Sequence, residues 1–364
     1  MRRRTLALVT DAFGGHGGIA KFNRDFLGAL CAQPDCEEVV AIPRLLASAP
    51  GPLPTRLTYP LDAAGSKLRY VLKLLRVLAA PGRFDLVICG HVNLVPLAWL
   101  ASVVSRSPLV LVVHGIDAWQ PTPNVIANLL ARRVDAFISV SALTRERFCA
   151  WTGLDAQRGF LLPNSIDLGA FGPGPKSEAL LQKYGLRDKV VIMTMGRLVS
   201  AERGKGFDEV LEALPSLLAD VPGLAYMIAG EGSDRTRLQE KADRLGVREH
   251  VVFTGYVPEE GKRDHYNLAD AFVMPSRGEG FGIVFLEAMA CGVPVVGSTA
   301  DGSREALRDG MLGALVDPGD AAALRREILA ALQRPKRVPE GLDYFSHPNF
   351  EQRVGQIVNN WRSR

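Results

Sequence analysis

Short runs of β-branched and other apolar residues alternate with helical patterns along the whole chain, and this alternation constrains the fold more than any other feature. Runs that are apolar throughout are typical of parallel strands with helices on both faces. The strands are expected at residues 6–10, 39–42, 85–89, 109–113, 136–140, 160–162, 190–195, 225–229, 251–254, 271–274, 295–298 and 314–316. The intervening helices are expected at residues 19–32, 66–79, 93–104, 142–151, 207–219, 233–245, 259–269, 283–290 and 320–332. The pattern therefore predicts repeated βαβ units and an α/β fold.

One Gly- and Pro-rich segment, residues 163–176, interrupts the alternation. A chain of 364 residues has room for two domains at about 150 residues each. We therefore expect Rossmann-like domains at residues 1–165 and 166–345, followed by a tail segment at 346–364 that ends in an amphipathic helix. If the two doubly wound parallel sheets face each other, a ligand-binding cleft lies between the carboxyl ends of their strands.

Composition excludes several classes of protein. The 47% hydrophobic and 23% charged residues are typical of a globular chain, not of a disordered or fibrous one. The net charge of +4 is too small to indicate a nucleic-acid partner. The five cysteines form no C-x-x-C pair, which predicts reduced thiols and no zinc site. The longest strongly apolar segment, 94–104, is too short to span a membrane, so we expect a cytoplasmic chain or one held at the inner membrane face.

The most informative segment is Pro275–Ala290, with the sequence PSRGEGFGIVFLEAMA. A predicted strand ends just before it, a glycine-rich turn follows, and a helix begins near Gly282. Glycines allow close approach of a ligand, and the N–H groups at a helix N-terminus favour a phosphate. Glu279 lies before this phosphate site, and Glu287 lies on the helix beyond it, at most about 12 Å from Glu279. Because carboxylates accept hydrogen bonds from hydroxyl groups, the spacing fits the two sugars of a nucleoside-diphosphate-sugar.

The segment Glu279–Glu287 resembles the E-x7-E signature of the retaining glycosyltransferases of family GT4, which have the GT-B fold. Further matches in the second half are G-R-L at 196–198, Lys-Gly at 205–206, A-G-E-G at 229–232, and segments at 301–305, 309–310 and 316–320. In the first half, the glycine loop at 14–20, His-Gly at 114–115 and P-N-S-I-D at 163–167 also fit. This resemblance implies that the first domain binds the acceptor, the second binds the donor, and the tail helix crosses back onto the first.

The resemblance also implies roles for individual residues. Donor-binding residues would be Gly17, Gly18, Arg197, Lys205, Tyr256, Val257, Glu279, Gly280, Phe281, Gly282 and Glu287. Among these, Glu287 would hold the ribose, and main-chain groups at Tyr256 and Val257 would form a wall for the nucleobase. The catalytic group would comprise Glu279, His114, Arg197 and Lys205, and Asp117 would bind the acceptor or orient His114. The two basic residues have a physical reason of their own, because positioned cations stabilise the diphosphate that leaves when a glycosidic bond to a nucleotide breaks. The residues at 201–204 lengthen the loop before Lys205 and make its position less certain than that of Arg197.

The resemblance implies a hexosyltransferase that retains the anomeric configuration. We expect it to need no metal ion, since the sequence contains no D-x-D motif. Its donor would be a UDP- or GDP-linked sugar, with no further cofactor. Its acceptor would be a saccharide or a lipid-linked hydroxyl in bacterial polysaccharide or glycolipid assembly. The alternatives are a non-catalytic sugar-nucleotide-binding accessory protein and a sugar-nucleotide epimerase of the same fold. A nicotinamide enzyme is weakly indicated by G-x-G-x-x-A at 15–20, where Arg44 replaces the expected ribose-binding acid.

The predicted helix at 66–79 is basic and amphipathic, and with Arg83 beyond it this segment allows peripheral membrane contact through residues 66–83. One face carries Leu68, Val71, Leu72, Leu75 and Leu78, and the other carries Arg69, Lys73 and Arg76. Two interpretations remain open at this point. The leucines pack on the sheet of their own domain while the cations are merely solvated, or the helix lies in an anionic membrane surface.

Overall fold

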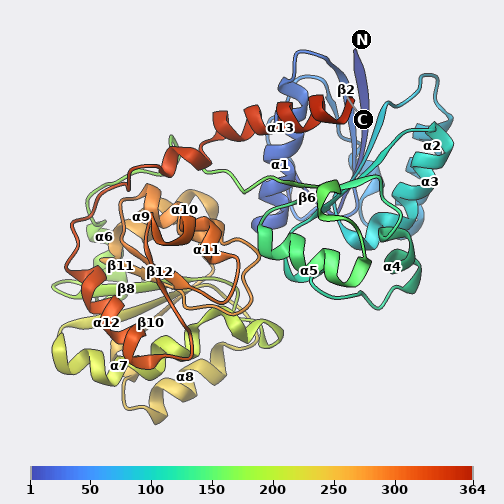
Figure 1. Cartoon of the computed structure of the whole chain (residues 1–364). Coiled ribbons are helices and arrows are strands. Elements are labelled where there is room, and N and C mark those ends of the chain that lie inside the picture. The colour runs from blue at the N-terminus through green and yellow to red at the C-terminus, as the bar shows by residue number, and fades with distance from the viewer. Residues whose placement is uncertain (1, 363–364) are drawn as a thin grey trace. The chain divides into compact units, whose positions relative to one another are not determined.

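The computed structural model describes residues 2–362, apart from the side chains of residues 201, 202, 361 and 362. The chain forms two compact units (Figure 1). Unit 1 comprises the chain up to Ser165 together with the C-terminal segment from His347, and unit 2 comprises Ile166–Ser346. Each unit is a separate α/β layer structure with its own sheet.

Unit 1 is built on a parallel sheet with the strand order β3-β2-β1-β4-β5-β6-β7. Its strands are β1 (Arg3–Val9), β2 (Cys36–Pro43), β3 (Leu57–Thr58), β4 (Leu86–Cys89), β5 (Leu109–Val113), β6 (Ala136–Ser139) and β7 (Gly159–Leu161). Its helices are α1 (Gly17–Ala32), α2 (Lys67–Ala79), α3 (Val95–Ser105), α4 (Val125–Ala131), α5 (Ala142–Thr152) and α13 (His347–Arg362). Helix α1 lies on one side of the sheet and α2 and α3 lie on the other, so the unit is doubly wound (Figure 1).

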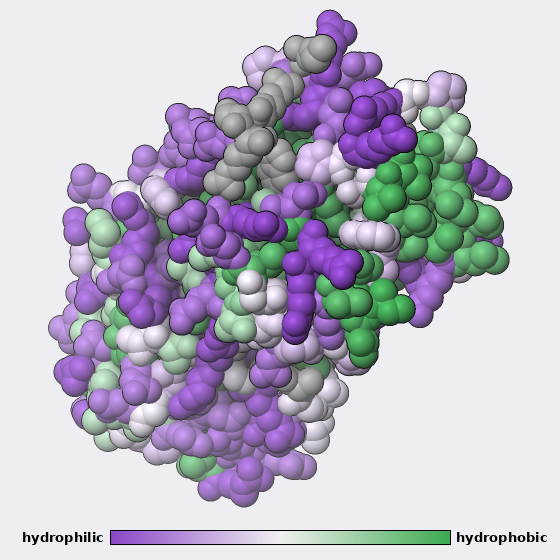
Figure 2. Space-filling model, turned by 45° about the vertical axis from the view of Figure 1, so that its right-hand side comes forward, coloured by the Kyte–Doolittle hydropathy of each residue, from purple (hydrophilic) through white to green (hydrophobic). Residues whose placement is uncertain are grey.

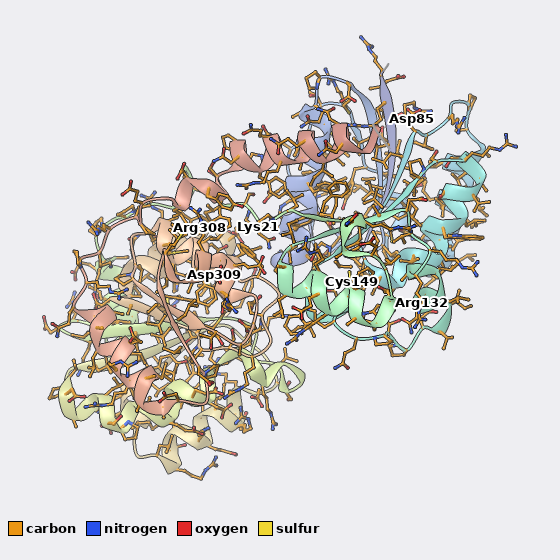
Figure 3. The ribbon with its side chains drawn as sticks, viewed as in Figure 1. Lys21, Asp85, Arg132, Cys149, Arg308 and Asp309 are labelled. Atoms are coloured by element: carbon orange, nitrogen blue, oxygen red, sulfur yellow. The ribbon has the colours of Figure 1, made fainter. Side chains whose placement is uncertain are left out.

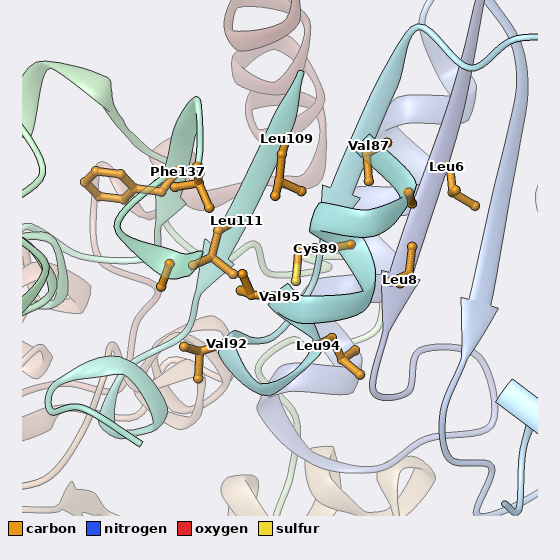
Figure 4. Close-up of a cluster of buried hydrophobic side chains, with 14 of the residues drawn as sticks. Leu6, Leu8, Val87, Cys89, Val92, Leu94, Val95, Leu109, Leu111 and Phe137 are labelled. Carbon is orange, nitrogen blue, oxygen red and sulfur yellow. The ribbon is translucent and has the colours of Figure 1, made fainter. Parts of the chain in front are cut away.

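The core of unit 1 follows from the two-residue period of its strands. Leu6 and Leu8 point to one face of β1, where they join buried residues of β4, β5 and the helices that cover this face (Figure 4). Tyr70 and Leu74 enter the same core from α2. On the other side, the C-terminal helix α13 packs on α1, and the ring centroids of Phe22 and Phe350 lie 5.8 Å apart. The C-terminal segment therefore completes unit 1 although it follows unit 2 in the chain.

Unit 2 repeats the same winding, with the strand order β10-β9-β8-β11-β12-β13 in one parallel sheet. Its strands are β8 (Val190–Met195), β9 (Leu224–Ala229), β10 (Val251–Gly255), β11 (Ala271–Val273), β12 (Val295–Ser298) and β13 (Ala314–Val316). Its helices are α6 (Glu178–Tyr184), α7 (Phe207–Asp220), α8 (Arg235–Arg244), α9 (Lys262–Leu268), α10 (Ile283–Ala290), α11 (Ser303–Ala306) and α12 (Ala321–Leu332). The loops after β8 and β11 emerge side by side, because these two strands are paired at the centre of the sheet.

The predicted fold class is confirmed, since both units are Rossmann-like parallel sheets between helices. Several short elements were not predicted: β3, α4, α6 and α11. Strand β3 has only two residues, and α4 has the sequence VIANLLA, which lacks the polar face that marks a surface helix. None of the helices in the described part of the chain combines the length and apolarity that crossing a bilayer would require. All five cysteines are free.

Candidate functional site

In unit 2, the loops that follow β8 and β11 are fastened to each other. The backbone N–H of Arg277 donates a hydrogen bond to the carbonyl oxygen of Gly204, at 2.6 Å. Gly206 has a φ of +85°, and a Cβ at this position would lie 2.9 Å from the carbonyl carbon of Pro275. Only glycine fits this close approach without strain, so the loop before α7 can rest directly on the loop after β11.

This contact brings Lys205 and Glu279 together. The Nζ atom of Lys205 lies 2.6 Å from Oε2 of Glu279, and the two side chains are only 15% and 19% exposed. The two residues are 74 positions apart in the sequence. A charge-assisted hydrogen bond in a partly dehydrated site orients both groups. The lengthened loop at 200–205 forms a turn of 3-10 helix and still delivers Lys205 to this position.

Arg197 belongs to the same edge of the sheet. It follows β8 directly, and its side chain is exposed. The backbone on either side is fixed to the next strand, because Gly196 donates to Ala229 O and Leu198 donates to Glu231 O, each at 3.0 Å. The guanidinium group is thus anchored at the carboxyl end of a central strand, where ligands of open α/β sheets bind.

A buried carboxylate that the sequence analysis did not single out shapes the glycine-rich turn. One oxygen of Asp301 accepts from Ser276 Oγ at 2.6 Å and from the backbone N–H of Glu279 at 2.8 Å. The other oxygen accepts from Ser303 Oγ at 2.6 Å and from the Ser303 N–H at 3.1 Å. Asp301 is 2% exposed, and its burial raises the pKa of the carboxyl group although these hydrogen bonds oppose that shift. The Asp-x-Ser spacing at 301–303 was the available signal, because it is typical of a side chain that caps its own turn.

The turn itself ends at Gly282, which caps α10 with a φ of +96°. At Gly302, an added Cβ would come within 2.2 Å of the carbonyl oxygen of Gly280, so the turn and the loop after β12 touch through their backbones. Phe281 is buried and packs edge-on against Phe345, with the ring centroids 5.6 Å apart. Gly280, Phe281 and Gly282 can therefore meet a ligand only through their backbone groups.

Glu287 lies one to two turns into α10 and is almost completely buried, with 1% exposure. Its Oε2 accepts a hydrogen bond from Tyr266 Oη at 2.7 Å, and its Oε1 accepts one from Lys262 Nζ at 3.1 Å. Lys262 also pairs with Glu259 at 2.8 Å. Burial lowers the pKa of the Lys262 ammonium, but the charges of Glu287 and Glu259 outweigh it and raise the pKa overall. The carboxylate predicted to bind ribose is thus also bonded to two side chains of α9.

The predicted nucleobase wall follows β10. Gly255 accepts a hydrogen bond from the N–H of Gly230 at 2.9 Å, which ties the wall to the loop after β9. Tyr256 is 64% exposed, whereas Val257 is buried. The backbone of Gly230 lies so close to Gly196 O that an added Cβ would come within 1.9 Å. The loops after β8, β9 and β10 therefore stand side by side at one edge of the sheet.

Unit 1 places its predicted site residues at the carboxyl ends of β1 and β5. Helix α1 begins at Gly17, which has a φ of +85°, and Gly17 and Gly18 are both exposed. The preceding loop is fixed from α1, because Asn23 Nδ2 donates to Asp11 O at 2.8 Å and Arg24 Nη1 donates to Gly15 O at 3.1 Å. The exposed glycines leave the first turn of α1 open to a ligand.

His114 follows β5 and lies against the ring of Phe22, with centroids 5.1 Å apart. Its Nε2 is 3.0 Å from Gly90 O. A carbonyl oxygen only accepts, so Nε2 carries the proton and Nδ1 of the neutral ring is an acceptor. Burial lowers the pKa of His114 to about 4, so the ring is neutral at physiological pH.

Asp117 Oδ2 lies 4.0 Å from His91 Nε2, and hydrogen bonds from backbone groups that include His114 favour the charged carboxylate. Burial raises the pKa of Asp117 and lowers that of His91. The ring of His114 is thus bonded to the backbone carbonyl of Gly90, and the suggestion that Asp117 orients His114 stays a prediction. The sequence could not predict this hydrogen bond to Gly90, since every residue has a backbone carbonyl.

Two family models match the chain when it is compared with known proteins. "Glycosyltransferase Family 4" matches residues 16–170, and "Glycosyl transferases group 1" matches residues 176–340. A relative in Mycolicibacterium smegmatis, the "GDP-mannose-dependent alpha-(1-6)-phosphatidylinositol monomannoside mannosyltransferase", is 35% identical over 300 residues, which cover 78% of this chain and 75% of the relative. The chain belongs to this family of glycosyltransferases. The predicted class of enzyme, a hexosyltransferase, is confirmed.

A second relative is also a mannosyltransferase. The "phosphatidyl-myo-inositol mannosyltransferase" of Mycobacterium leprae is 31% identical over 338 residues, covering 90% of this chain and 85% of the relative. Among solved structures, Anabaena HepE in complex with UDP and glucose aligns with a TM-score of 0.76 at 21% identity, over 99% of this chain and 100% of that one. Sucrose-phosphate synthase from Thermosynechococcus elongatus aligns with a TM-score of 0.78 at 20% identity and covers both chains completely. At such identities these structures establish the fold alone.

Proposed function

We propose that this glycosyltransferase moves a hexosyl group from a nucleoside-diphosphate-hexose to a hydroxyl group of a lipid-linked or saccharide acceptor, with retention and without a metal ion. The observation that carries the proposal is the Lys205–Glu279 pair, 2.6 Å apart at the N-terminal end of α10 and on the same sheet edge as Arg197. It joins one cation for a phosphate to one carboxylate for a sugar hydroxyl.

In this proposal the two basic residues serve the leaving group. When the bond between the anomeric carbon and the phosphate oxygen breaks, negative charge accumulates on the diphosphate. Arg197 holds two phosphate oxygens with its planar group and Lys205 supplies a point charge. Cations placed in advance stabilise that charge more in the transition state than in the ground state, which accelerates the reaction.

Glu279 and Glu287 serve the two ends of the donor. Glu279 accepts hydrogen bonds from hydroxyl groups of the transferred sugar, on a backbone that Asp301 holds at 2.8 Å. Glu287 accepts a hydrogen bond from a ribose hydroxyl, in addition to those that it accepts from Tyr266 and Lys262. A carboxylate has about four acceptor positions, so two existing bonds leave capacity for a ligand. Backbone groups at Tyr256 and Val257 receive the base.

The acceptor is assigned to unit 1. The two relatives described above are named for phosphatidylinositol-type acceptors, and this supports a lipid-linked hydroxyl as the receiving group. His114 offers the Nδ1 acceptor to a hydroxyl of donor or acceptor, and Asp117 binds an acceptor hydroxyl. Such an acceptor resides in a membrane, which supports peripheral contact at the cytoplasmic face through residues 66–83.

A donor screen followed by a transfer assay tests the proposal. GDP-mannose, UDP-glucose and related nucleotide-sugars are titrated by calorimetry, and the donor that binds is incubated with phosphatidylinositol-containing vesicles. We expect release of the nucleoside diphosphate only when the acceptor is present. Donor binding without transfer to any acceptor would indicate the non-catalytic binding protein instead, and conversion of the donor sugar alone would indicate an epimerase.

A further inference from the structure

The apolar side chains exposed on unit 1 belong largely to its helices. Hydrophobic side chains gather on one side of this unit in the space-filling view (Figure 2), and Leu68, Leu72 and Leu75 of α2 are exposed. The interpretation that the leucines from Leu68 to Leu78 pack together on their own sheet is therefore wrong for these three side chains. Polar side chains collect instead at the carboxyl ends of β4 and β5, where ligands of open α/β sheets bind.

His91 follows β4 and presents one unused donor. Its Nδ1 accepts a hydrogen bond from the backbone N–H of Asn93 at 3.1 Å, so the side chain caps the short 3-10 helix that begins at Val92. A nitrogen that accepts carries no proton, and the neutral ring therefore has its proton on Nε2. Burial lowers the pKa of His91, which keeps the ring neutral at physiological pH. Within the described part of the chain, no group accepts a hydrogen bond from this Nε2–H.

Asp117 follows β5 and presents one unused acceptor. Strands β4 and β5 are paired, so the loops that carry His91 and Asp117 emerge as neighbours. Backbone groups of residues 114–117 hydrogen-bond to the Asp117 carboxylate, but its Oδ2 atom has no hydrogen-bond partner among the residues that the structure describes. A buried oxygen without a partner is costly, which favours a ligand that donates a hydrogen bond to it.

The gap between the two groups has the size of one oxygen atom. His91 Nε2 and Asp117 Oδ2 are 4.0 Å apart, which is too long for a direct hydrogen bond. An oxygen about 2.8 Å from each would accept from Nε2–H and donate to Oδ2. A hydroxyl group does both, whereas an ether or keto oxygen only accepts. The two side chains are 15% and 14% exposed, so the pair is not sealed into the core.

We propose that His91 and Asp117 together bind one hydroxyl group of the acceptor, which accepts from His91 Nε2 and donates to Asp117 Oδ2. The proposal rests on the proposed function, which assigns the acceptor to unit 1, and it adds His91 as a residue that selects the acceptor. His114 is anchored beside the pair, because its Nε2 donates to the carbonyl oxygen of Gly90, the residue before His91. The arrangement selects a ring with neighbouring hydroxyl groups, one for the pair and one for Nδ1 of His114.

Titration of the full chain with soluble headgroup analogues tests this inference without a transfer reaction. Glycerophosphoinositol carries a ring of hydroxyl groups, whereas glycerophosphocholine has the same glycerol phosphate and no such ring. Dissociation constants are measured by ligand-observed proton NMR. The wild-type chain should bind glycerophosphoinositol more tightly than glycerophosphocholine, and equal or absent binding would overturn the inference.

Two substitutions of His91 separate hydroxyl binding from capping. His91→Asn keeps an acceptor for the Asn93 N–H but has no donor at the position of Nε2, so Kd for glycerophosphoinositol should rise about 3- to 10-fold. His91→Gln places an N–H near that position and gives up the cap, so it should retain most of the affinity but unfold at a lower temperature. The reverse order of affinities would show that His91 only caps its turn. The control His250→Asn replaces a ring that bonds to a backbone carbonyl in unit 2 and should bind like the wild type.

A double-substitution cycle tests whether the two residues share one hydroxyl. Asp117→Asn should raise Kd about tenfold or more, and adding His91→Asn should raise it by less than about twofold further, because the shared hydroxyl is already lost. Additive losses would indicate separate contacts and overturn the pairing. Unchanged binding by both single variants would assign the gap to a water molecule and overturn it as well.

Transfer assays distinguish this inference from the proposed function. With phosphatidylinositol-containing vesicles, His91→Asn should raise the KM of the acceptor and leave the KM of the donor unchanged. A wild-type chain that shows the expected binding pattern but transfers no sugar would refute the proposed function and support the hydroxyl site. A chain that transfers sugar equally well with His91→Asn, at all acceptor concentrations, would support the function and overturn the site.

Discussion

Replacing Glu279 by Gln should strengthen the binding of a nucleoside diphosphate and lower the rate of sugar transfer. The Glu279 carboxylate lies 2.6 Å from the Lys205 ammonium group, on the edge of the sheet proposed to receive the diphosphate. A nucleoside diphosphate must therefore compete with this carboxylate for the ammonium group and also approach its negative charge. The neutral amide removes the competing charge but keeps the shape of the side chain.

The magnitudes follow from the partial burial of the pair. A pair with 15% and 19% exposed side chains is worth about 1 kcal/mol once screening is included, so the bare nucleoside diphosphate should bind up to about fivefold more tightly. A hydrogen bond from a sugar hydroxyl to a charged carboxylate contributes about 1.5–3 kcal/mol. Its loss should lower kcat/KM by roughly 10- to 150-fold.

Calorimetry with GDP and UDP, beside initial-rate transfer assays, measures both effects on one preparation. Lys205→Met should weaken binding of the nucleoside diphosphate, the reverse of the Glu279→Gln effect. Asp309→Asn, which removes the same charge at a 69% exposed position (Figure 3), should change neither quantity. Weaker diphosphate binding by Glu279→Gln, or unchanged turnover, would refute the reasoning.

Three further predictions concern groups that hold the two units in shape. Asp301→Asn should reduce kcat/KM at least about tenfold, because one amide oxygen cannot replace the four hydrogen bonds that fix the turn; steady-state kinetics with normal urea unfolding would show it. Burial would raise the pKa of Asp208, but hydrogen bonds from Arg237 and Lys241 outweigh it and lower the pKa to about 2. Asp208→Asn should therefore lower the free energy of unfolding by about 2 kcal/mol at pH 7. In urea titrations, this difference between variant and wild type should vanish as the pH falls from about 4 to 2. His114 stays neutral when buried, whereas in the unfolded chain it takes up a proton below about pH 6.5. The free energy of unfolding should therefore fall by about 3 kcal/mol between pH 6.5 and 4. The same fall in a His114→Gln variant would contradict the pKa of about 4.

The alternation of strand and helix was enough to predict the fold, because buried parallel strands leave apolar runs that a sequence displays directly. Some short or unusual elements were not predicted from the sequence, and the reasons are physical. Strand β3 is two residues long, and α4 shows no polar face because its outer surface is as apolar as its inner one. For the same reason, the exposed apolar side chains of α2, α3 and α4 could not be predicted from the sequence of any one helix.

The candidate site was predicted as a set of residues but not as a geometry. Sequence spacing places Glu287 eight residues after Glu279, yet it cannot show that α9 brings Tyr266 and Lys262 onto that carboxylate. Nor can it pair Lys205 with Glu279 across 74 positions, since the contact depends on glycines that let two loops touch. The Asp-x-Ser spacing at 301–303 indicates a capped turn, but it cannot show that Asp301 also accepts hydrogen bonds from Ser276 and Glu279.

The most direct test of the account is the proton NMR spectrum of the transfer product, formed from the donor selected by calorimetry in the presence of excess EDTA. Cations of the protein, rather than a metal ion, are proposed to stabilise the leaving diphosphate. The account therefore predicts undiminished product that keeps the anomeric configuration of the donor. An inverted linkage, or product formation that stops when EDTA is added, would contradict it.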